Sequence, residues 1–203
     1  MAGQHADWAL GFADETWWSR LAQPQVPTWA EATAGPLRLV EQEAPKGDPD
    51  PKALAGYGVL LRQMGQDGRM DERVWVRFVD GRPVSAITEQ FLAWCALQLQ
   101  AVGVRVWVLI WDNASWHVSK RVRAYIRAHN RQVKQRGQGV HILSCYLPVK
   151  SPWLNPIEPH WVHGKRAILE PARLLSAQEI ADRVCAHFGF SHDDHLSIPD
   201  KVA

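Results

Sequence analysis

Three short apolar runs predict the central strands of a sheet. Residues 8–13 (WALGFA) predict a short buried strand that ends at Asp14. Residues 104–111 (VRVWVLIW) form a nearly continuous β-branched and aromatic run that ends at Asp112. Such a run is typical of a strand buried on both faces in the middle of a parallel or mixed sheet. Residues 141–146 (HILSCY) predict a further strand.

Two other apolar runs predict a β-hairpin. Residues 57–63 and 73–80 are joined by a polar, glycine-bearing loop at 64–71. Apolar side chains alternate in the second run, as expected for a half-buried strand. Before the hairpin, residues 23–53 are rich in Pro, Gly and Ala and predict a long irregular excursion, with one short extended piece at 37–42.

Helical spacing of apolar residues predicts helices at 85–102, 117–130, 157–168 and 176–189. The basic stretch 130–139 (NRQVKQRGQG) predicts a loop. Alternating strands and helices favour an α/β fold, with a mixed sheet and helices on both faces. We expect one domain across residues 1–203.

Composition excludes several classes of protein. With 46% hydrophobic and 22% charged residues, the chain is neither disordered nor fibrous. It has no apolar run of membrane-spanning length and no signal peptide at its start. Its three cysteines form no CxxC pair, which argues against disulfides and a cysteine zinc site. We expect a soluble intracellular protein without a membrane partner.

Positive charge is concentrated in one part of the chain. Residues 117–166 hold ten Lys and Arg and five His against one acid, Glu158. Such a block can attract a polyanion, although a solvated helix face with a basic loop explains it equally well. The candidate DNA-binding residues are Lys120, Arg121, Arg123, Arg127, Lys150, Lys165 and Arg166.

Three carboxylates are candidates for a metal site. Asp14 and Asp112 each follow a predicted strand, and parallel neighbouring strands would bring them to one edge of the sheet. Glu158 opens a later helix. Carboxylates without nearby cysteine suit Mg²⁺ or Mn²⁺, and two such ions can drive phosphodiester chemistry. The alternatives are a turn cap at Asp112 and, for Glu158, a helix capping box with Asn155.

Two motifs resemble the DDE transposases of the mariner-like insertion-sequence group. The stretch DNASWH at 112–117 matches that group's DNA-x-x-H, and LPVKSPWLNPIEPHW at 147–161 matches LP-x-x-SP-x-LNP-I-E-x-x-W. The upstream GFADE at 11–15 resembles the strand of the first acid. The resemblance runs from about residue 8 to about residue 170.

The resemblance implies a ribonuclease H-like fold with Asp14, Asp112 and Glu158 as the catalytic and metal-binding triad. In that group the acids hold two divalent ions, which drive DNA cleavage and then strand transfer. The implied partners are transposon ends and target DNA. Asn113, His117 and Asn155 are candidates to support the acids. For His117, a partly exposed position at the helix start is an equally good interpretation.

The chain departs from the group's pattern in two ways. Forty-five residues separate Asp112 from Glu158, which is more than the group has, and we place the surplus in the loop 130–139. About seven residues precede the first strand, whereas the group carries helix-turn-helix DNA-binding domains there. Either a separate helix-turn-helix chain supplies the recognition of DNA at the cytoplasmic nucleoid, or this chain is a truncated, degenerate copy. A homodimer is a further expected assembly. A non-catalytic transposase fragment that binds DNA or full-length transposase is the alternative. For Trp116, Trp153 and Trp161 we expect packing rather than base stacking.

Overall fold

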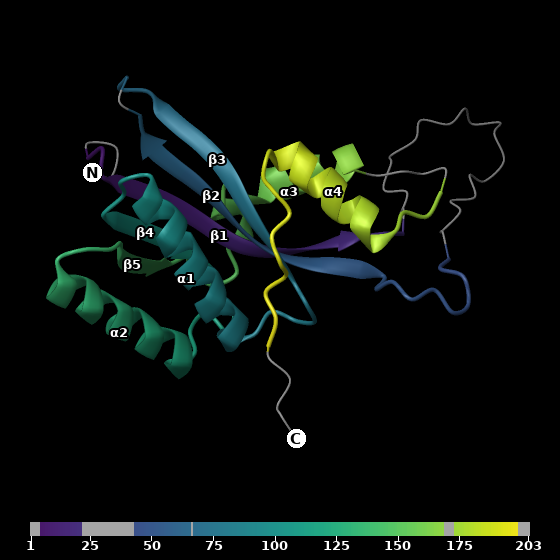
Figure 1. Cartoon of the computed structure of the whole chain (residues 1–203), viewed down its shortest axis with the longest axis horizontal. Coiled ribbons are helices and arrows are strands. Elements are labelled where there is room, and N and C mark those ends of the chain that lie inside the picture. Colours follow the sequence, from purple (N-terminus) through teal and green to yellow (C-terminus); the bar gives the residue numbers. More distant parts are fainter. Residues whose placement is uncertain (1–4, 22–42, 66, 169–172, 199–203) are drawn as a thin grey trace.

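The computed structural model of the protein describes residues 5–21, 43–65, 67–168 and 173–198. Its centre is a five-stranded sheet in the order β3-β2-β1-β4-β5 (Figure 1). The strands are β1 (Trp8–Ser19), β2 (Ala53–Met64), β3 (Met70–Val79), β4 (Val106–Trp111) and β5 (His141–Tyr146).

The sheet is mixed, and β1 lies at the change of direction. On one side β1 pairs with β2, and β2 with β3, in antiparallel fashion, which forms the predicted hairpin. On the other side β1 pairs with β4, and β4 with β5, in parallel. The two strands predicted to end in aspartates are therefore parallel neighbours.

The helices lie in two pairs, one for each face of the sheet (Figure 1). They are α1 (Ser85–Ala101), α2 (Lys120–Arg136), α3 (Glu158–Ile168) and α4 (Ala177–Phe188), with a short 3-10 helix, η2 (Pro152–Leu154), before α3. Burial of both sheet faces explains why the central strands read as apolar runs. In the described part of the chain, no helix has the length and apolar character needed to cross a membrane.

Two hydrophobic clusters attach the helices to the sheet. On the first face, Tyr57 and Trp107 are fully buried against apolar residues of α1 and α2. On the second face, the ring of Trp18 meets those of Trp161 and Phe188 edge to face, with centroids 5.8 and 5.9 Å away. Such aromatic contacts add to the stabilisation that burial of apolar area provides.

The first strand is longer than the sequence predicts. It does not stop at Asp14 but continues to Ser19, paired with β2 along its whole second half. Thr16 and Trp18 are buried there, and Trp17 is exposed, so the alternation continues beyond the acids. The parallel ladder with β4 does stop early, at Phe12 opposite Ile110.

The second helix differs from its prediction at both ends. It begins at Lys120, where the Ser119 side chain accepts from the backbone N–H of Val122, and not at residue 117. It runs on to Arg136 and ends at Gly137, which has a left-handed φ of 65°. The loop predicted at 130–139 is therefore wrong for residues 130–136, and the surplus length extends the helix.

The irregular excursion is described only from residue 43 onward. Residues 43–52 form turns and irregular backbone, as predicted, while the extended piece expected at 37–42 lies outside the described residues. Arg20, at the end of β1, is 5% exposed and ties this segment down. Its guanidinium donates to Asp48 Oδ2 at 2.9 Å and to the Leu175 carbonyl before α4 at 2.6 Å.

Close packing at Gly58 gives a test of how α3 sits on the sheet. A Cβ on Gly58 would lie 2.2 Å from the ring of Trp161. Gly58→Ala should therefore lower the free energy of unfolding by about 1–3 kcal/mol, as overpacking does. Urea unfolding without metal measures the change. Trp161→Phe removes the clashing ring atoms, so the double variant should be no less stable than Trp161→Phe alone; an equally large loss there would contradict this packing.

Candidate active site

Asp14 and Asp112 lie side by side in the register of two parallel strands. The last pair of the β1–β4 ladder is Phe12 with Ile110, and each aspartate comes two residues later. Asp14 is still inside β1, paired on its other side with Gly58 of β2, whereas Asp112 directly follows β4. The expected convergence of these two residues at one end of the sheet is confirmed.

The alternation of β1 turns Asp14 toward α3. Phe12 and Trp18 belong to the cluster beneath α3 and α4, and Asp14 has the same parity. The indole Nε1 of Trp161, on α3, donates to Asp14 Oδ2 at 3.0 Å. Burial, together with the neighbouring charges of Glu15 and Glu158, raises the pKa of Asp14 to about 7. The site thus holds negative charge that nothing nearby fully compensates.

Asp112 has the opposite electrostatic setting. Its Oδ1 lies 2.7 Å from His117 Nδ1 and accepts from the backbone N–H of Ala114 at 2.9 Å. The hydrogen bond with His117 holds the pKa of Asp112 below its usual range. Its side chain is 52% exposed, so the carboxylate remains reachable from solvent.

His117 is fully buried, so the alternative of a partly exposed helix-start histidine is wrong. Its Nε2 lies 2.7 Å from Glu15 Oε1, while Nδ1 faces Asp112. The ring also stacks on Trp111, with centroids 4.4 Å apart. Burial alone would lower the pKa of His117, but the hydrogen bonds and charges of the two carboxylates raise it to about 9.

Glu158 is half-buried at the start of α3, which Asn155 fastens to the sheet. Asn155 is 3% exposed, and its Nδ2 donates to the carbonyl of Ala13 at 3.1 Å, next to Asp14. The capping box expected for Glu158 does not form, because the backbone N–H of Asn155 donates to Pro152 O at 2.8 Å. At the start of the segment 147–155, which leads to α3, the Asn113 Nδ2 donates to the Leu147 carbonyl at 2.6 Å.

The three acids fall into two groups. Glu158 acts electrostatically on Asp14, while Asp112 contacts His117. Within the described ranges, no three His, Cys, Asp or Glu side chains are close enough together to form a metal site. Asp14 and Glu158 therefore interact with each other, whereas Asp112 interacts with His117, and all three oxygen donors lie toward the end of the sheet where the β1–β4 ladder stops.

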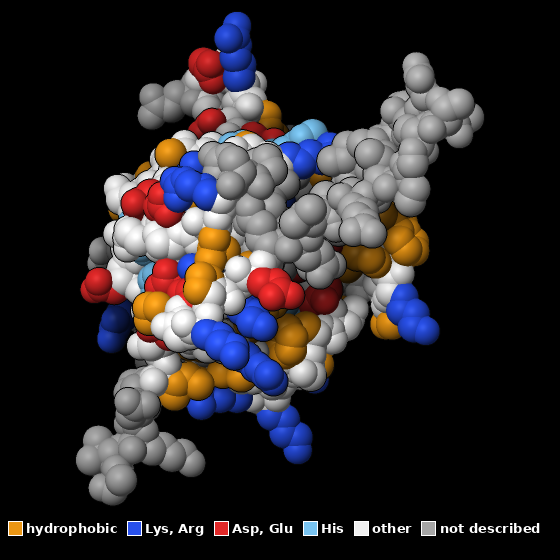
Figure 2. All heavy atoms as spheres, turned by 90° about the vertical axis from the view of Figure 1, so that its right-hand side faces the viewer, with side chains coloured by type: hydrophobic (Ala, Val, Ile, Leu, Met, Phe, Trp, Pro, Cys, Tyr) orange, Lys and Arg blue, Asp and Glu red, His pale blue; other side chains and the backbone are white. Residues whose placement is uncertain are grey.

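The candidate basic residues have different surroundings. Lys120, Arg123, Arg127, Lys150, Lys165 and Arg166 are exposed. Arg121 differs, because its guanidinium binds Glu89 of α1 at 2.8 Å. Partial desolvation lowers the pKa of Lys165, whereas the negative charges of Glu158 and Asp14 act to raise it. The effect of these two charges indicates that the amine lies near both acids. On the face shown in Figure 2, basic side chains lie among acidic and hydrophobic ones.

The three tryptophans near the motifs separate into two kinds. Trp161 is 2% exposed and Trp116 is partly buried, as expected for packing, and each donates to a carboxylate. Trp153 is 75% exposed, so the packing interpretation is wrong for it. The sequence does not predict that Glu15 contacts His117, or that the indole N–H groups of Trp116 and Trp161 donate to carboxylates. The only sequence signals for these contacts are that Glu15 is adjacent to Asp14 and that Trp116 is adjacent to His117.

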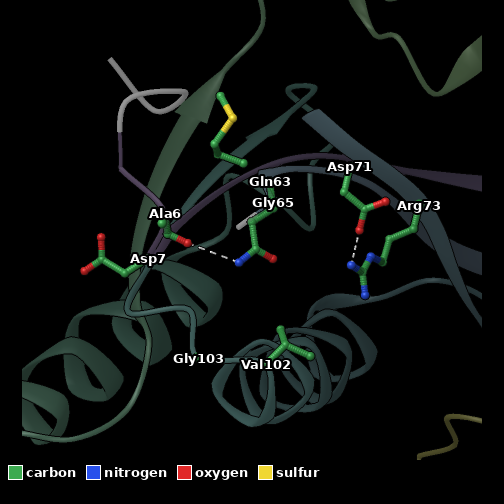
Figure 3. Close-up of a pocket in the computed structure, with 9 residues that line it drawn as sticks. Ala6, Asp7, Gln63, Gly65, Asp71, Arg73, Val102 and Gly103 are labelled. Carbon is green, nitrogen blue, oxygen red and sulfur yellow. Dashed lines mark hydrogen bonds and ion pairs between the residues drawn. The ribbon is translucent and has the colours of Figure 1, made fainter. Parts of the chain in front are cut away.

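One cavity lies away from the acids. Its volume is about 400 Å³, and residues before β1 and after α1 line it together with the β2–β3 hairpin (Figure 3). Asp7 and Gln63 are among its lining residues. This is the end of the sheet where β1 and β4 begin, whereas Asp14 and Asp112 lie where their ladder ends.

A family model described as DDE superfamily endonuclease matches residues 68–181, more than half of the chain. This range contains Asp112 and Glu158, and Asp14 precedes it. No match is found among curated protein sequences.

Solved structures of Mos1 transposase are similar in fold. The Mos1 paired-end complex with left transposon end matches with a TM-score of 0.58 and 16% identity, over 94% of this chain and 50% of that chain. The pre-cleavage Mos1 transpososome matches with a TM-score of 0.56 and 14% identity, over 92% of this chain and 49% of that chain. The catalytic domain of Mos1 mariner transposase matches with a TM-score of 0.51 and 16% identity, over 94% of this chain and 73% of that chain. The chain thus spans about half the length of the first two, and the predicted ribonuclease H-like fold is confirmed.

The opposite settings of Asp14 and Asp112 predict opposite effects on stability without metal. Because the pKa of Asp14 is raised, the folded chain binds a proton that the unfolded chain releases between about pH 4 and pH 7, so stability falls as pH rises through this range. Asp14→Asn should remove this loss and raise Tm at pH 7.5 by at least about 3 °C. The gain should shrink toward pH 4.

Asp112→Asn should lower Tm at the same pH, because the lowered pKa of Asp112 marks a stabilising carboxylate. The contribution of the Asp112 carboxylate to stability is lost only when the pH falls through the pKa that this group has in the folded protein. Thermal unfolding in chelator measures both variants. Glu43→Gln, at an exposed acid, is the control and should leave Tm unchanged. Shifts of the same sign for Asp14→Asn and Asp112→Asn would contradict the two settings.

Proposed function

Because the chain belongs to the DDE superfamily endonuclease family, we propose that residues 1–203 form the catalytic domain of a transposase, with Asp14, Asp112 and Glu158 as its catalytic acids. One observation carries this proposal. Asp14 and Asp112 lie two residues beyond the same pair of the parallel ladder, and Glu158 opens the helix that packs over Asp14. Carboxylates from the interior of β1, from the residue after β4 and from the start of α3 thus lie toward the same end of the sheet.

The donor set fits divalent magnesium or manganese. All three groups are hard oxygen ligands, which these ions prefer. Asp14 is half-buried, and the charges of Glu15 and Glu158 repel it, so a bound cation would relieve an electrostatic penalty at this point. When bound, two such ions would activate a water or hydroxyl nucleophile and stabilise the oxygen that leaves.

The surrounding residues of the chain fix the acids. Trp161 holds Asp14 through Oδ2, and His117 and the Ala114 N–H hold Asp112 through Oδ1. The amine of Lys165 lies near Glu158 and Asp14, where it can bind a phosphate oxygen of DNA. A rigid arrangement of this kind reduces the reorganisation that the reaction requires.

The proposed substrate is DNA, as transposon ends and target. Two of the similar Mos1 structures are titled as a paired-end complex with a transposon end and a strand transfer complex, which supports this partner. On this chain, Lys120, Arg123 and Arg127 form an exposed basic row on α2, which begins a few residues after Asp112. We further propose that a second copy of the chain, or a helix-turn-helix chain that recognises the transposon ends, acts with it at the nucleoid.

Loss of the acids should abolish cleavage. With Mg²⁺ or Mn²⁺, the protein should nick supercoiled plasmid DNA, and Asp112→Asn and Glu158→Gln should each slow nicking by at least about 100-fold. Such a factor corresponds to the several kcal/mol that metal ions contribute. Glu43→Gln should nick at the parent rate. A parent without activity would favour the non-catalytic fragment, and unchanged nicking by Asp112→Asn would contradict the triad.

Binding through α2 should depend on salt. Replacing Lys120, Arg123 and Arg127 with Gln should lower the slope of log affinity against log salt by about 2–3, because each phosphate contact contributes about 0.9. All DNA sequences should be affected alike. The control replaces Arg62, Arg69 and Arg73 of the β2–β3 hairpin with Gln, which removes the same charge. Equal slopes for the two triple variants would place the DNA path away from α2.

A further inference from the structure

Two adjacent acids on β1 face opposite sides of the sheet. Asp14 points toward α3, where Trp161 donates to it. Glu15 points to the other face, where its Oε1 meets Trp116 Nε1 at 2.9 Å and His117 Nε2 at 2.7 Å. The Glu15 side chain is only 10% exposed, so it is held in a polar pocket and does not belong to the surface.

His117 connects Glu15 with Asp112. Its two ring nitrogens each lie 2.7 Å from a carboxylate oxygen, Glu15 Oε1 on one side and Asp112 Oδ1 on the other. The ring has no exposed surface, and it stacks on Trp111, the last residue of β4. A hydrogen bond at each end and an aromatic face fix both the position and the rotation of the imidazole.

Asp112 is fixed through one oxygen only. Its Oδ1 takes the hydrogen bonds of His117 and of the Ala114 N–H. Its Oδ2 makes no hydrogen bond to the part of the protein that the structure describes, and half of the side chain is exposed. The two hydrogen bonds to Oδ1 therefore set the rotation of this carboxylate about its Cβ–Cγ bond.

We propose that Glu15, acting through His117, is a positioning residue that turns Asp112 Oδ2 toward the metal ions. This inference rests on the proposed function. Glu15 does not itself serve as a ligand, because it lies on the face of the sheet opposite to Trp161 and Asp14, and its Oε1 already accepts two hydrogen bonds. Partners that orient a ligand from behind typically change metal affinity by 10–100-fold when they are removed.

Mn²⁺ binding to the full chain without DNA tests the inference. Measured by electron paramagnetic resonance of free Mn²⁺, Glu15→Ala and His117→Ala should each weaken binding about 10–100-fold. Glu15→Gln should stay within about 3-fold of the parent, because its amide oxygen can accept the same two hydrogen bonds. Glu89→Ala, which removes a carboxylate paired with Arg121 on the same side of the sheet, is the matched control and should not change binding.

The double variant separates positioning from a general loss of structure. If Glu15 acts through His117, Glu15→Ala combined with His117→Ala should bind Mn²⁺ no more weakly than His117→Ala alone. Additive losses, or parent-like binding by Glu15→Ala, would overturn the inference. If Glu15→Ala does not fold in chelator, Glu15→Met fills the same space without an acceptor and makes the same test.

The outcome for Asp112→Asn distinguishes this inference from the proposed function. If Asp112→Asn weakens Mn²⁺ binding while Glu15→Ala does not, the positioning role of Glu15 fails and the metal site stands. If the parent does not bind Mn²⁺, or Asp112→Asn binds it equally well, the proposed metal chemistry fails, and with it the inference.

Discussion

The parallel pairing of β1 with β4 is the constraint on which the candidate site depends. Parallel strands run in the same direction, so residues at equal distances beyond their last pair come to the same end of the sheet. Here the ladder stops at Phe12 and Ile110, and an aspartate follows each after one further residue. A register shift by one residue would turn Asp14 to the face of Glu15 and separate it from Glu158. The apolar pairing of these strands thus fixes the carboxylates before any metal is bound.

The period of two along β1 gives neighbouring acids different functions. Asp14 and Glu15 are adjacent in the chain, yet Asp14 contacts Trp161 of α3, whereas Glu15 contacts Trp116 and His117 before α2. The face of α3 supplies Trp161 and brings Glu158 close, while the other face supplies Trp116 and His117. Because a strand carries its side chains alternately up and down, one short segment can both line a site and support it from behind.

Much of the fold was predictable because burial leaves a clear pattern. The apolar run before Asp112 and the hairpin pattern were interpreted correctly, since their side chains alternate or are wholly apolar. The end of β1 was not, because two charged residues interrupt an apolar run and resemble a strand end. The extension of α2 was missed because residues 130–136 are almost entirely polar and leave little apolar spacing to detect.

The candidate site was predictable in part for a related reason. Local motifs and strand ends identified Asp14, Asp112 and Glu158 as candidates, since these signals lie within a few residues of each acid. Contacts across 102 residues, as between His117 and Glu15, leave no trace in spacing or periodicity. The same holds for the indole of Trp161, which reaches Asp14 across 147 residues. Only the pairing of strands brings such partners together.

The two aspartates differ in how their charge is balanced, and this difference has a physical basis. Asp112 and Glu15 share a buried histidine whose pKa is raised to about 9, so one positive charge partly offsets these two carboxylates. For Asp14, burial and the repulsion of Glu15 and Glu158 outweigh the hydrogen bond from Trp161 and raise its pKa to about 7. A cation would gain most at Asp14 and would need the least rearrangement at Asp112. The chain therefore combines one acid that neighbouring negative charges destabilise with another whose orientation is fixed by hydrogen bonds.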